Sequence, residues 1–428
     1  MPRQYQYGFA NEFATEALPG ALPRGQNSPQ HAPYGLVSEL VSGTSLAAPR
    51  AQNRRSYLFR IRPSTGTHAF TPFALDNFQT PPLAIAPYPG ALRWGPFPLG
   101  EAECDFLDGI ETVAANGSPG GHAGMALHIY RATRSMEGRV FSNGDGDMLM
   151  LPQQGALSIV TELGVIDVAP GEFALLPKGL KFRVDLTGAE ARGFICENYG
   201  LPFVLPDLGL IGSHGLANSI DFMTPVAAFE DSDVACTLIH KFAGNFWSAD
   251  IGYSPFDVVA WRGNWAPCKY DMRNFAVIGA LSHDHPDPSI FCALSSPSDA
   301  VAGGNVDFMI LPPRWVVAEH TFRPPGFHRN AVAEILGLIE GSHDARSSDF
   351  APGSMSLTNN WVAHGPDTRT FEVARTAPLE PRYDNDTLVF MLETRFPLQL
   401  TRRAMEAGNR RVNCAQTWAG FTKRFPGG

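Results

Sequence analysis

Residues 156–184 read ALSIVTELGVIDVAPGEFALLPKGLKFRV, and this stretch decides the fold of the chain. Two short runs rich in apolar and β-branched residues, 156–161 and 165–168, flank Gly164 and predict a β-hairpin. Two further short runs follow, separated from their neighbours by the turn-forming sequences PG and PKG. Short strands at this spacing predict a jelly-roll barrel within a β unit that covers about residues 125–200.

A second β segment, from about 275 to 400, contains the strand-like runs 307–311 and 388–392. Helices are few, and residues 400–420 favour one or two amphipathic turns. The chain has 36 Pro and 42 Gly, which favours many strands and tight turns. We therefore expect a mostly β protein with two jelly-roll or β-sandwich domains. The expected division is an N-terminal arm, an N-terminal β domain and a C-terminal catalytic domain: 1–55, 56–275 and 276–428.

The N-terminal arm is rich in Gly, Pro, Asn and Gln and shows little periodic structure. It nevertheless carries apolar and aromatic residues, which are Tyr5, Tyr7, Phe9, Phe13, Tyr34 and Leu36. No periodicity indicates how these side chains are buried locally. We therefore expect the arm to pack, and to pack against another subunit.

Charge and cysteine usage exclude several classes of protein. The net charge of -9 argues against a nucleic acid or an anionic membrane as partner. No run approaches 18 consecutive apolar residues, so no membrane span is expected. The N-terminus lacks the apolar core of a signal peptide. The six cysteines are scattered without a CxxC pair, which favours reduced thiols and a cytoplasmic protein.

The sequence FHRNAVAE at 327–334, followed by HGPD at 364–367, indicates a metal site. Two histidines and one carboxylate, here His328, Glu334 and His364, can hold Fe(II) on one face and leave positions open. Six residues of straight strand span about 20 Å, so the chain must turn between His328 and Glu334. The alternative is a core histidine beside an unrelated surface glutamate.

Two parts of the chain resemble cupin domains. The run from Pro170 to Phe182 resembles the second half of a cupin, but Phe182 stands where metal-binding cupins carry a histidine. This resemblance implies that the N-terminal barrel is metal-free and structural. The spacing from His328 to Glu334 and Gly341 resembles the first cupin metal motif, with Asn330 where many cupins carry a second histidine.

Across nearly its whole length the chain resembles homogentisate 1,2-dioxygenases. The segments that carry the resemblance are 9–27, RIRPS at 60–64, YRATRSME at 130–137, GLAN at 215–218, DVVAW at 257–261, DHPDPSI at 284–290, PPRW at 312–315, TFRPP at 321–325 and HGPD at 364–367. The family opens the ring of homogentisate with O2 to give 4-maleylacetoacetate, in the breakdown of phenylalanine and tyrosine. The resemblance implies an Fe(II) cofactor, a small aromatic substrate and a homo-hexamer built as a dimer of trimers.

The resemblance also implies roles for individual residues. His328, Glu334 and His364 would be the iron ligands, His364 would also contact the substrate, and His285 would be the acid-base residue. The family usually has a tyrosine that contacts the substrate nine residues after the glutamate ligand, and here that position is His343. We therefore expect His343 to be a substrate contact with a different pH behaviour.

Arg323 is a candidate partner for a substrate carboxylate, because a guanidinium group binds carboxylates with two parallel hydrogen bonds. A structural ion pair is the alternative for this residue.

Three further alternatives stay open. His283 and His285 are a rival metal pair, since residues i and i+2 of a strand point to one face, although Pro286 and Pro288 put them at a strand end. The substrate could be gentisate or a related dihydroxyphenyl acid, although those families tend to use three histidines. The chain could also be a non-enzymatic binding or storage protein with two cupin domains.

Overall fold

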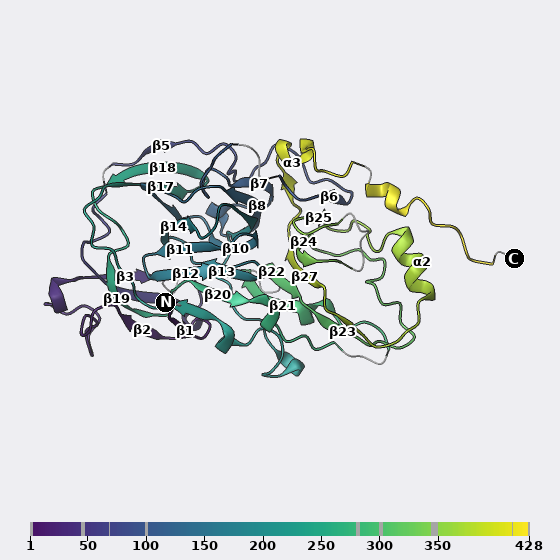
Figure 1. Ribbon diagram of the computed structural model, residues 1–428, viewed down its shortest axis with the longest axis horizontal. Coiled ribbons are helices and arrows are strands. Elements are labelled where there is room, and N and C mark those ends of the chain that lie inside the picture. Colours follow the sequence, from purple (N-terminus) through teal and green to yellow (C-terminus); the bar gives the residue numbers. More distant parts are fainter. Residues whose placement is uncertain are drawn as a thin grey trace.

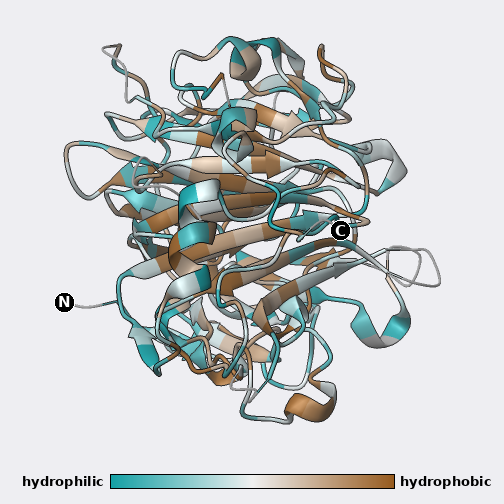
Figure 2. Ribbon diagram, turned by 90° about the vertical axis from the view of Figure 1, so that its right-hand side faces the viewer, coloured by the Kyte–Doolittle hydropathy of each residue, from teal (hydrophilic) through white to brown (hydrophobic). Residues whose placement is uncertain are grey.

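The chain forms a mostly β fold in the computed structural model, which describes residues 3–43, 48–67, 69–98, 102–279, 283–298, 303–343, 350–412 and 414–426. In Figure 1 the N-terminal half lies on the left and the C-terminal half on the right, and the last residues extend away from the body. Strands through the middle of the molecule are largely hydrophobic, and many loops at its edge are hydrophilic (Figure 2). The predicted fold class is confirmed.

The predicted hairpin is confirmed. Strands β11 (Leu157–Thr161) and β12 (Gly164–Val168) pair antiparallel, and Thr161 lies opposite Gly164. The turn therefore consists of Glu162 and Leu163, and Gly164 begins the second strand.

The other two runs of the same stretch form β13 (Glu172–Leu176) and β14 (Lys181–Leu186). The later pair of predicted strands is also present, as β22 (Gly304–Leu311) and β27 (Thr387–Thr394), which pair antiparallel.

Three sheets are stacked, and the middle one is covered on both faces. Its order is β1 (Tyr5–Tyr7), β16 (Met223–Pro225), β20 (Cys268–Asp271), β13, β10 (Asp147–Gln154), β15 (Ala191–Asn198), β8 (Met125–Ala132), β7 (Glu111–Ala115) and β28 (Gln399–Leu400). Successive side chains of β10 pack on opposite faces of this sheet, in two different apolar clusters. Leu149 belongs to one cluster and Met150 to the other. Burial on both faces explains why β10 reads as an apolar run without alternation.

One outer layer is a seven-stranded sheet of the N-terminal half. Its order is β12, β11, β14, β9 (Arg139–Asn143), β17 (Cys236–Phe242), β18 (Asn245–Ile251) and β5 (Thr71–Phe73). Phe182 is buried in the core between this sheet and the middle one, where its ring packs edge to face against Phe141.

The other outer layer carries the candidate site. Its order is β21 (Cys292–Pro297), β22, β27, β24 (Ala333–Gly341), β25 (Met355–Thr358) and β6 (Leu92–Trp94). The halves exchange one strand each, because β6 from the N-terminal half joins this sheet and β28 from the C-terminal half joins the middle sheet.

Two small sheets and a few helices complete the described chain. The four-stranded sheet contains β2 (Phe13–Glu16), β19 (Val258–Gly263), β4 (Arg55–Arg60) and β3 (Val37–Ser42), and the two-stranded sheet contains β23 (Arg314–Val316) and β26 (Arg382–Asp384). The α-helices are α2 (Thr368–Thr376) and α3 (Arg402–Glu406), and a short 3-10 helix covers Cys414–Trp418. The amphipathic turns expected at 400–420 are therefore present.

The N-terminal arm packs on its own chain. Its strands β1 and β2 pair with β16 and β19, and the side chains of Phe9 and Phe13 are 9% and 8% exposed. The expectation that the apolar residues of the arm pack on another subunit is wrong for these two. Sequence periodicity missed this burial because each strand is only three or four residues long.

All six cysteines are free thiols. None of the helices in the described ranges is long and apolar enough to cross a membrane.

Candidate metal centre

His328, Glu334 and His364 come together in the C-terminal half. One ligand atom from each residue lies within 4.8 Å of the ligand atoms of the other two. His328 is half-buried, and Glu334 and His364 are buried. No other such group of three His, Cys, Asp or Glu side chains is found in the described ranges.

The backbone positions the two histidines opposite each other. His328 and His364 form an isolated antiparallel bridge, in which the N–H of each residue donates to the carbonyl of the other, at 3.0 and 3.1 Å. Their ring centroids are 4.1 Å apart. Glu334 reaches the same place from the start of β24, because the chain bends at residues 331–332 just before that strand begins. The predicted turn between the two ligands is therefore present.

The HGPD sequence holds this bridge in place, and each of its residues has a separate contact. A Cβ atom at Gly365 would lie 2.6 Å from a ring carbon of Phe327 and 3.0 Å from its Cα, so only glycine allows the two segments to approach. The carbonyl of Pro366 accepts a hydrogen bond from Trp418 Nε1 at 3.0 Å. Asp367 caps α2 by accepting from the Thr370 N–H at 2.8 Å.

Hydrogen bonds fix the tautomer of both histidines. His328 Nδ1 lies 2.7 Å from the carbonyl of Gly326, and His364 Nδ1 lies 3.0 Å from the carbonyl of Val362. A carbonyl oxygen can only accept, so Nδ1 carries the proton in both rings and Nε2 of the neutral ring presents a lone pair. This arrangement is typical of histidines that bind a metal.

The donor atoms fit a bound cation. His364 Nε2 faces Glu334 Oε2 at 3.4 Å, so two electron-rich atoms point at one another unless a cation lies between them. A proton between these two atoms would bridge only this pair. A metal ion would bind both atoms and also the third donor, His328. Two neutral imidazoles and one carboxylate form the set that non-haem Fe(II) oxygenases use, with coordination positions left open for other ligands.

A further carboxyl group lies beside this centre. Glu393 on β27 is directly opposite Glu334 on β24. Burial raises the pKa of Glu393 to about 7, and the negative charge of Glu334 adds to the shift. Asp287 also contributes to it, which places the segment that carries His285 near the carboxylates of the metal centre.

His285 itself is exposed. Its Nε2 atom lies 2.5 Å from the carbonyl of Phe322, and its backbone N–H donates to Asp284 at 2.9 Å. Since a carbonyl only accepts, Nε2 carries a proton here and Nδ1 is the atom left for proton transfer. The rival partner, His283, stacks on His320 with ring centroids 6.2 Å apart. Neither histidine belongs to the ligand set described above.

His343 lies far from the metal centre of its own chain. Glu334 and Gly341 on β24 are seven steps apart, which span about 23 Å at about 3.3 Å per residue. Beyond that end, the His343 ring packs edge to face with Phe350 at a centroid distance of 6.4 Å. This separation argues against the expected contact of His343 with a substrate held at the metal centre of the same chain. It stays a prediction only for the site of a neighbouring copy.

Arg323 contacts backbone carbonyls. Its Nη2 donates to Ala318 at 3.3 Å, and its Nη1 donates to the carbonyl of Glu380. The guanidinium therefore ties two loops of the C-terminal half together. Its contact with a substrate carboxylate stays a prediction.

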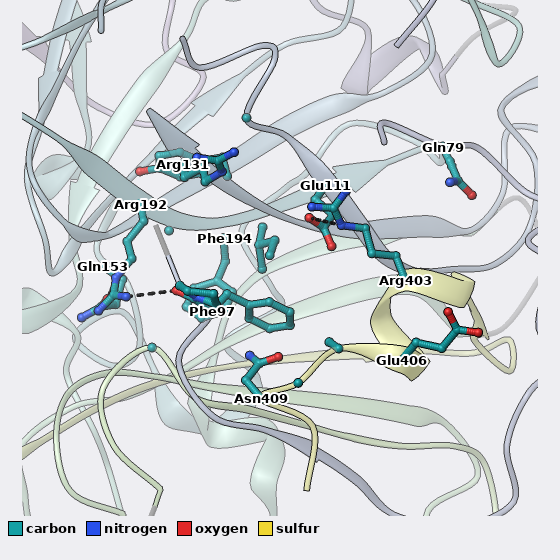
Figure 3. Close-up of a pocket in the computed structure, with 18 of the residues that line it drawn as sticks. Gln79, Phe97, Glu111, Arg131, Gln153, Arg192, Phe194, Arg403, Glu406 and Asn409 are labelled. Carbon is teal, nitrogen blue, oxygen red and sulfur yellow. Dashed lines mark hydrogen bonds and ion pairs between the residues drawn. The ribbon is translucent and has the colours of Figure 1, made fainter. Parts of the chain in front are cut away.

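A cavity of about 840 Å³ lies apart from the metal centre, between the middle sheet and α3 (Figure 3). None of the three ligands lines it. Its polar side chains contact the protein itself: Arg403 Nε is 2.8 Å from Glu111 Oε2, and Arg192 Nε donates to Gln153 at 3.0 Å. The metal centre therefore remains the candidate functional site, and this cavity does not replace it.

Comparisons with known families decide the assignment of the chain. The model described as "Homogentisate 1,2-dioxygenase N-terminal" matches residues 4–272, and the model described as "Homogentisate 1,2-dioxygenase C-terminal" matches residues 273–425. The chain belongs to the homogentisate 1,2-dioxygenase family. The resemblance found in the sequence is thereby confirmed, and a non-enzymatic storage protein is set aside.

Similar solved structures are distant. Protein Ylba from E. coli is 8% identical, with 75% of this chain and 96% of that chain covered and a TM-score of 0.31. A variant of oxalate decarboxylase from Bacillus subtilis is 8% identical, with 73% and 78% covered and a TM-score of 0.30. AerE from Microcystis aeruginosa is 8% identical, with 71% and 98% covered and a TM-score of 0.28. Similarities at this level add nothing to the assignment made from the family models.

Sequence reasoning missed the partners that orient the ligands. The carbonyls of Gly326 and Val362 belong to the backbone, so no residue type in the sequence predicts their role. Asn330 was interpreted as a departure from the cupin pattern and as the place of the turn, and not as a partner of Glu334. Its position between two ligands was the available signal.

Proposed function

We propose that this member of the homogentisate 1,2-dioxygenase family uses Fe(II) to convert homogentisate and O2 to 4-maleylacetoacetate in phenylalanine and tyrosine breakdown. The observation that supports it best is the His328–Glu334–His364 set, whose three donor atoms lie within 4.8 Å of one another. The match of the chain to both family models supports homogentisate as the substrate.

The residues present suit this chemistry. When bound, Fe(II) would supply the electron transfer and the acidity that O2 and a phenol need to react. His328 and His364 present neutral Nε2 atoms, and their Nδ1–H bonds to backbone carbonyls keep both rings from turning. Glu334 contributes one negative charge, which would balance only part of the charge of a divalent ion. A phenolate oxygen of the substrate could balance the rest.

His285 is proposed to move the phenol proton. Its Nε2–H is held by the Phe322 carbonyl, so Nδ1 would accept and return the proton. An imidazole can both accept and donate a proton, which suits both directions of transfer. Arg323 and, from a neighbouring copy, His343 are proposed substrate contacts.

The direct test is turnover after anaerobic loading with Fe(II). Homogentisate should be cleaved with uptake of one O2 per ring, and gentisate should react far more slowly. The matched control is the same protein treated with a chelator and not reloaded, which should be inactive. Faster cleavage of gentisate would replace the proposed substrate, and equal activity without metal would refute the role of Fe(II).

A further inference from the structure

Asn330 lies against the ligand set without belonging to it. Its side-chain Nδ2 lies 3.2 Å from Glu334 Oε2. That oxygen is the same atom that faces His364 Nε2 at 3.4 Å. A carboxylate oxygen accepts hydrogen bonds, so the amide N–H donates to it. This bond turns the carboxylate group and holds Oε2 next to His364.

The backbone of Asn330 makes a second link to the metal centre. Its carbonyl accepts a hydrogen bond from the Trp361 N–H at 2.7 Å. Trp361 has a φ of +63°, a strained conformation for a bulky residue that needs support from its surroundings. His364 follows three residues later, so one residue contacts both the carboxylate ligand and the segment that leads to a histidine ligand.

We propose that Asn330 is the positioning residue of the metal centre, which orients Glu334 through its amide and keeps the protein's ligand set at three. This inference rests on the proposed function, because it concerns the metal that the function needs. An amide nitrogen whose lone pair is delocalised does not bind a metal, and Asn330 turns this nitrogen towards Glu334. Asn330 therefore fills the space beside that ligand without adding a fourth donor atom there. A side chain with a free ring nitrogen at this position would offer a fourth donor atom beside Glu334.

Two substitutions test the two parts of the proposal. Asn330→Ala removes the hydrogen bond to Glu334 and keeps the backbone link to Trp361. Asn330→His puts imidazole Nδ1 where the amide Nδ2 stands, since both atoms are bonded to Cγ. Asn360→Ala is the matched control, because Asn360 is a neighbouring amide that donates to the carbonyls of Ala331 and Arg395, at 2.6 and 3.1 Å, and to no ligand.

The measurement is Co(II) binding by competition with a chelator, together with the visible spectrum of bound Co(II) and the melting temperature of the metal-free protein. Asn330→Ala should weaken Co(II) binding about 10–100-fold without a comparable loss of melting temperature. Asn330→His should bind Co(II) at least as tightly as the wild type, with a changed spectrum, and should lose ring cleavage when loaded with Fe(II). Asn360→Ala should keep wild-type Co(II) affinity and spectrum.

Three results would overturn the proposal. Wild-type affinity in Asn330→Ala would show that the amide does not position Glu334. A metal-free protein that melts much earlier, or fails to fold, would show that Asn330 supports the fold instead. An unchanged spectrum with full activity in Asn330→His would show that the position is not next to an open coordination site. Because Co(II) binding needs no substrate, inactivity of the wild type towards homogentisate would refute the proposed function and leave these results intact.

Discussion

The sequence predicts the identity of the metal-centre residues better than it predicts their orientation. His328, Glu334 and His364 were predicted from residue type and spacing, because few side chains bind Fe(II) and a turn was needed between the first two. Their orientation depends on the carbonyls of Gly326 and Val362, which the sequence does not distinguish from any other carbonyl. The role of His343 was predicted from the family pattern, which places a tyrosine nine residues after the glutamate ligand. That pattern does not say that most of β24 lies between the two residues.

A single substitution separates proton transfer from metal binding. His285→Asn should lower kcat about 10²–10⁴-fold while the iron content stays that of the wild type, because this side chain lies outside the ligand set. The check is kcat and iron content measured on the same preparation. His283→Asn, which removes a ring that stacks on His320, is the control and should change neither quantity. Loss of iron from His285→Asn would move that residue into the ligand set.

Elements of regular structure were predicted where they are long or sharply bounded. The hairpin of β11 and β12 and the pair β22 and β27 have clear runs of β-forming residues and turns between them. The arm strands β1 and β2 were missed because three or four residues carry too little pattern, and their pairing with β16 and β19 joins segments more than 200 residues apart. Such long-range pairing is decided by packing and not by local sequence.

A buried charge network joins three strands of the N-terminal half. Lys241 on β17 and His128 on β8 both contact Glu197 on β15, and all three side chains are 0% exposed. Asn143 and Tyr199 also donate to Glu197, at 2.7 and 3.1 Å. Burial alone would raise the pKa of Glu197, but the ammonium group of Lys241 and the contact with His128 outweigh it and lower that pKa to about 2.

This network predicts a pH dependence of stability. Unfolded Glu197 titrates near its ordinary value of 4.5, so the unfolded chain binds more protons between pH 4.5 and 2. The stabilisation is therefore complete above pH 4.5 and is lost as pH falls towards 2. Glu197→Gln should lose about 3–5 kcal/mol at pH 7, because it leaves the charge of Lys241 partly uncompensated, and its free energy of unfolding should fall less over that acid range.

Urea unfolding at several pH values checks this. Glu12→Gln is the control, since the bridge from Glu12 to Arg55 is solvent-exposed and should contribute at most about 1 kcal/mol. An acid dependence in Glu197→Gln as steep as that of the wild type would contradict the assignment of the low pKa.

At the scale of the whole molecule, the two halves share strands and a core. β6 and β28 each cross into the other half, and one apolar cluster contains side chains of both the middle sheet and the C-terminal sheet. Sequence analysis predicted the two β segments, but it did not predict this exchange. Strand partners more than 250 residues apart leave no local pattern.

The homo-hexamer that the family resemblance implies stays a prediction for the whole molecule. Several large apolar side chains of the C-terminal half are more than half exposed, namely Trp315, Phe327, Trp361, Val373, Val412 and Phe425. Where such side chains adjoin one another on a surface, they are typical of sites that bind another protein. We expect light scattering to give a mass six times that of the 46.4 kDa chain. A fully active monomer would contradict the hexamer and any contact of His343 with a neighbouring site.

The iron content of Glu334→Ala tests the central claim most directly. Glu334 supplies the only carboxylate of the ligand set, and its side chain belongs to no apolar cluster of the described residues. The variant should therefore fold with the circular dichroism spectrum of the wild type. After anaerobic loading and desalting, the wild type should retain about one iron per chain and the variant almost none. Wild-type iron content in a folded Glu334→Ala protein would show that Glu334 is not a ligand and that the metal centre described here is wrong.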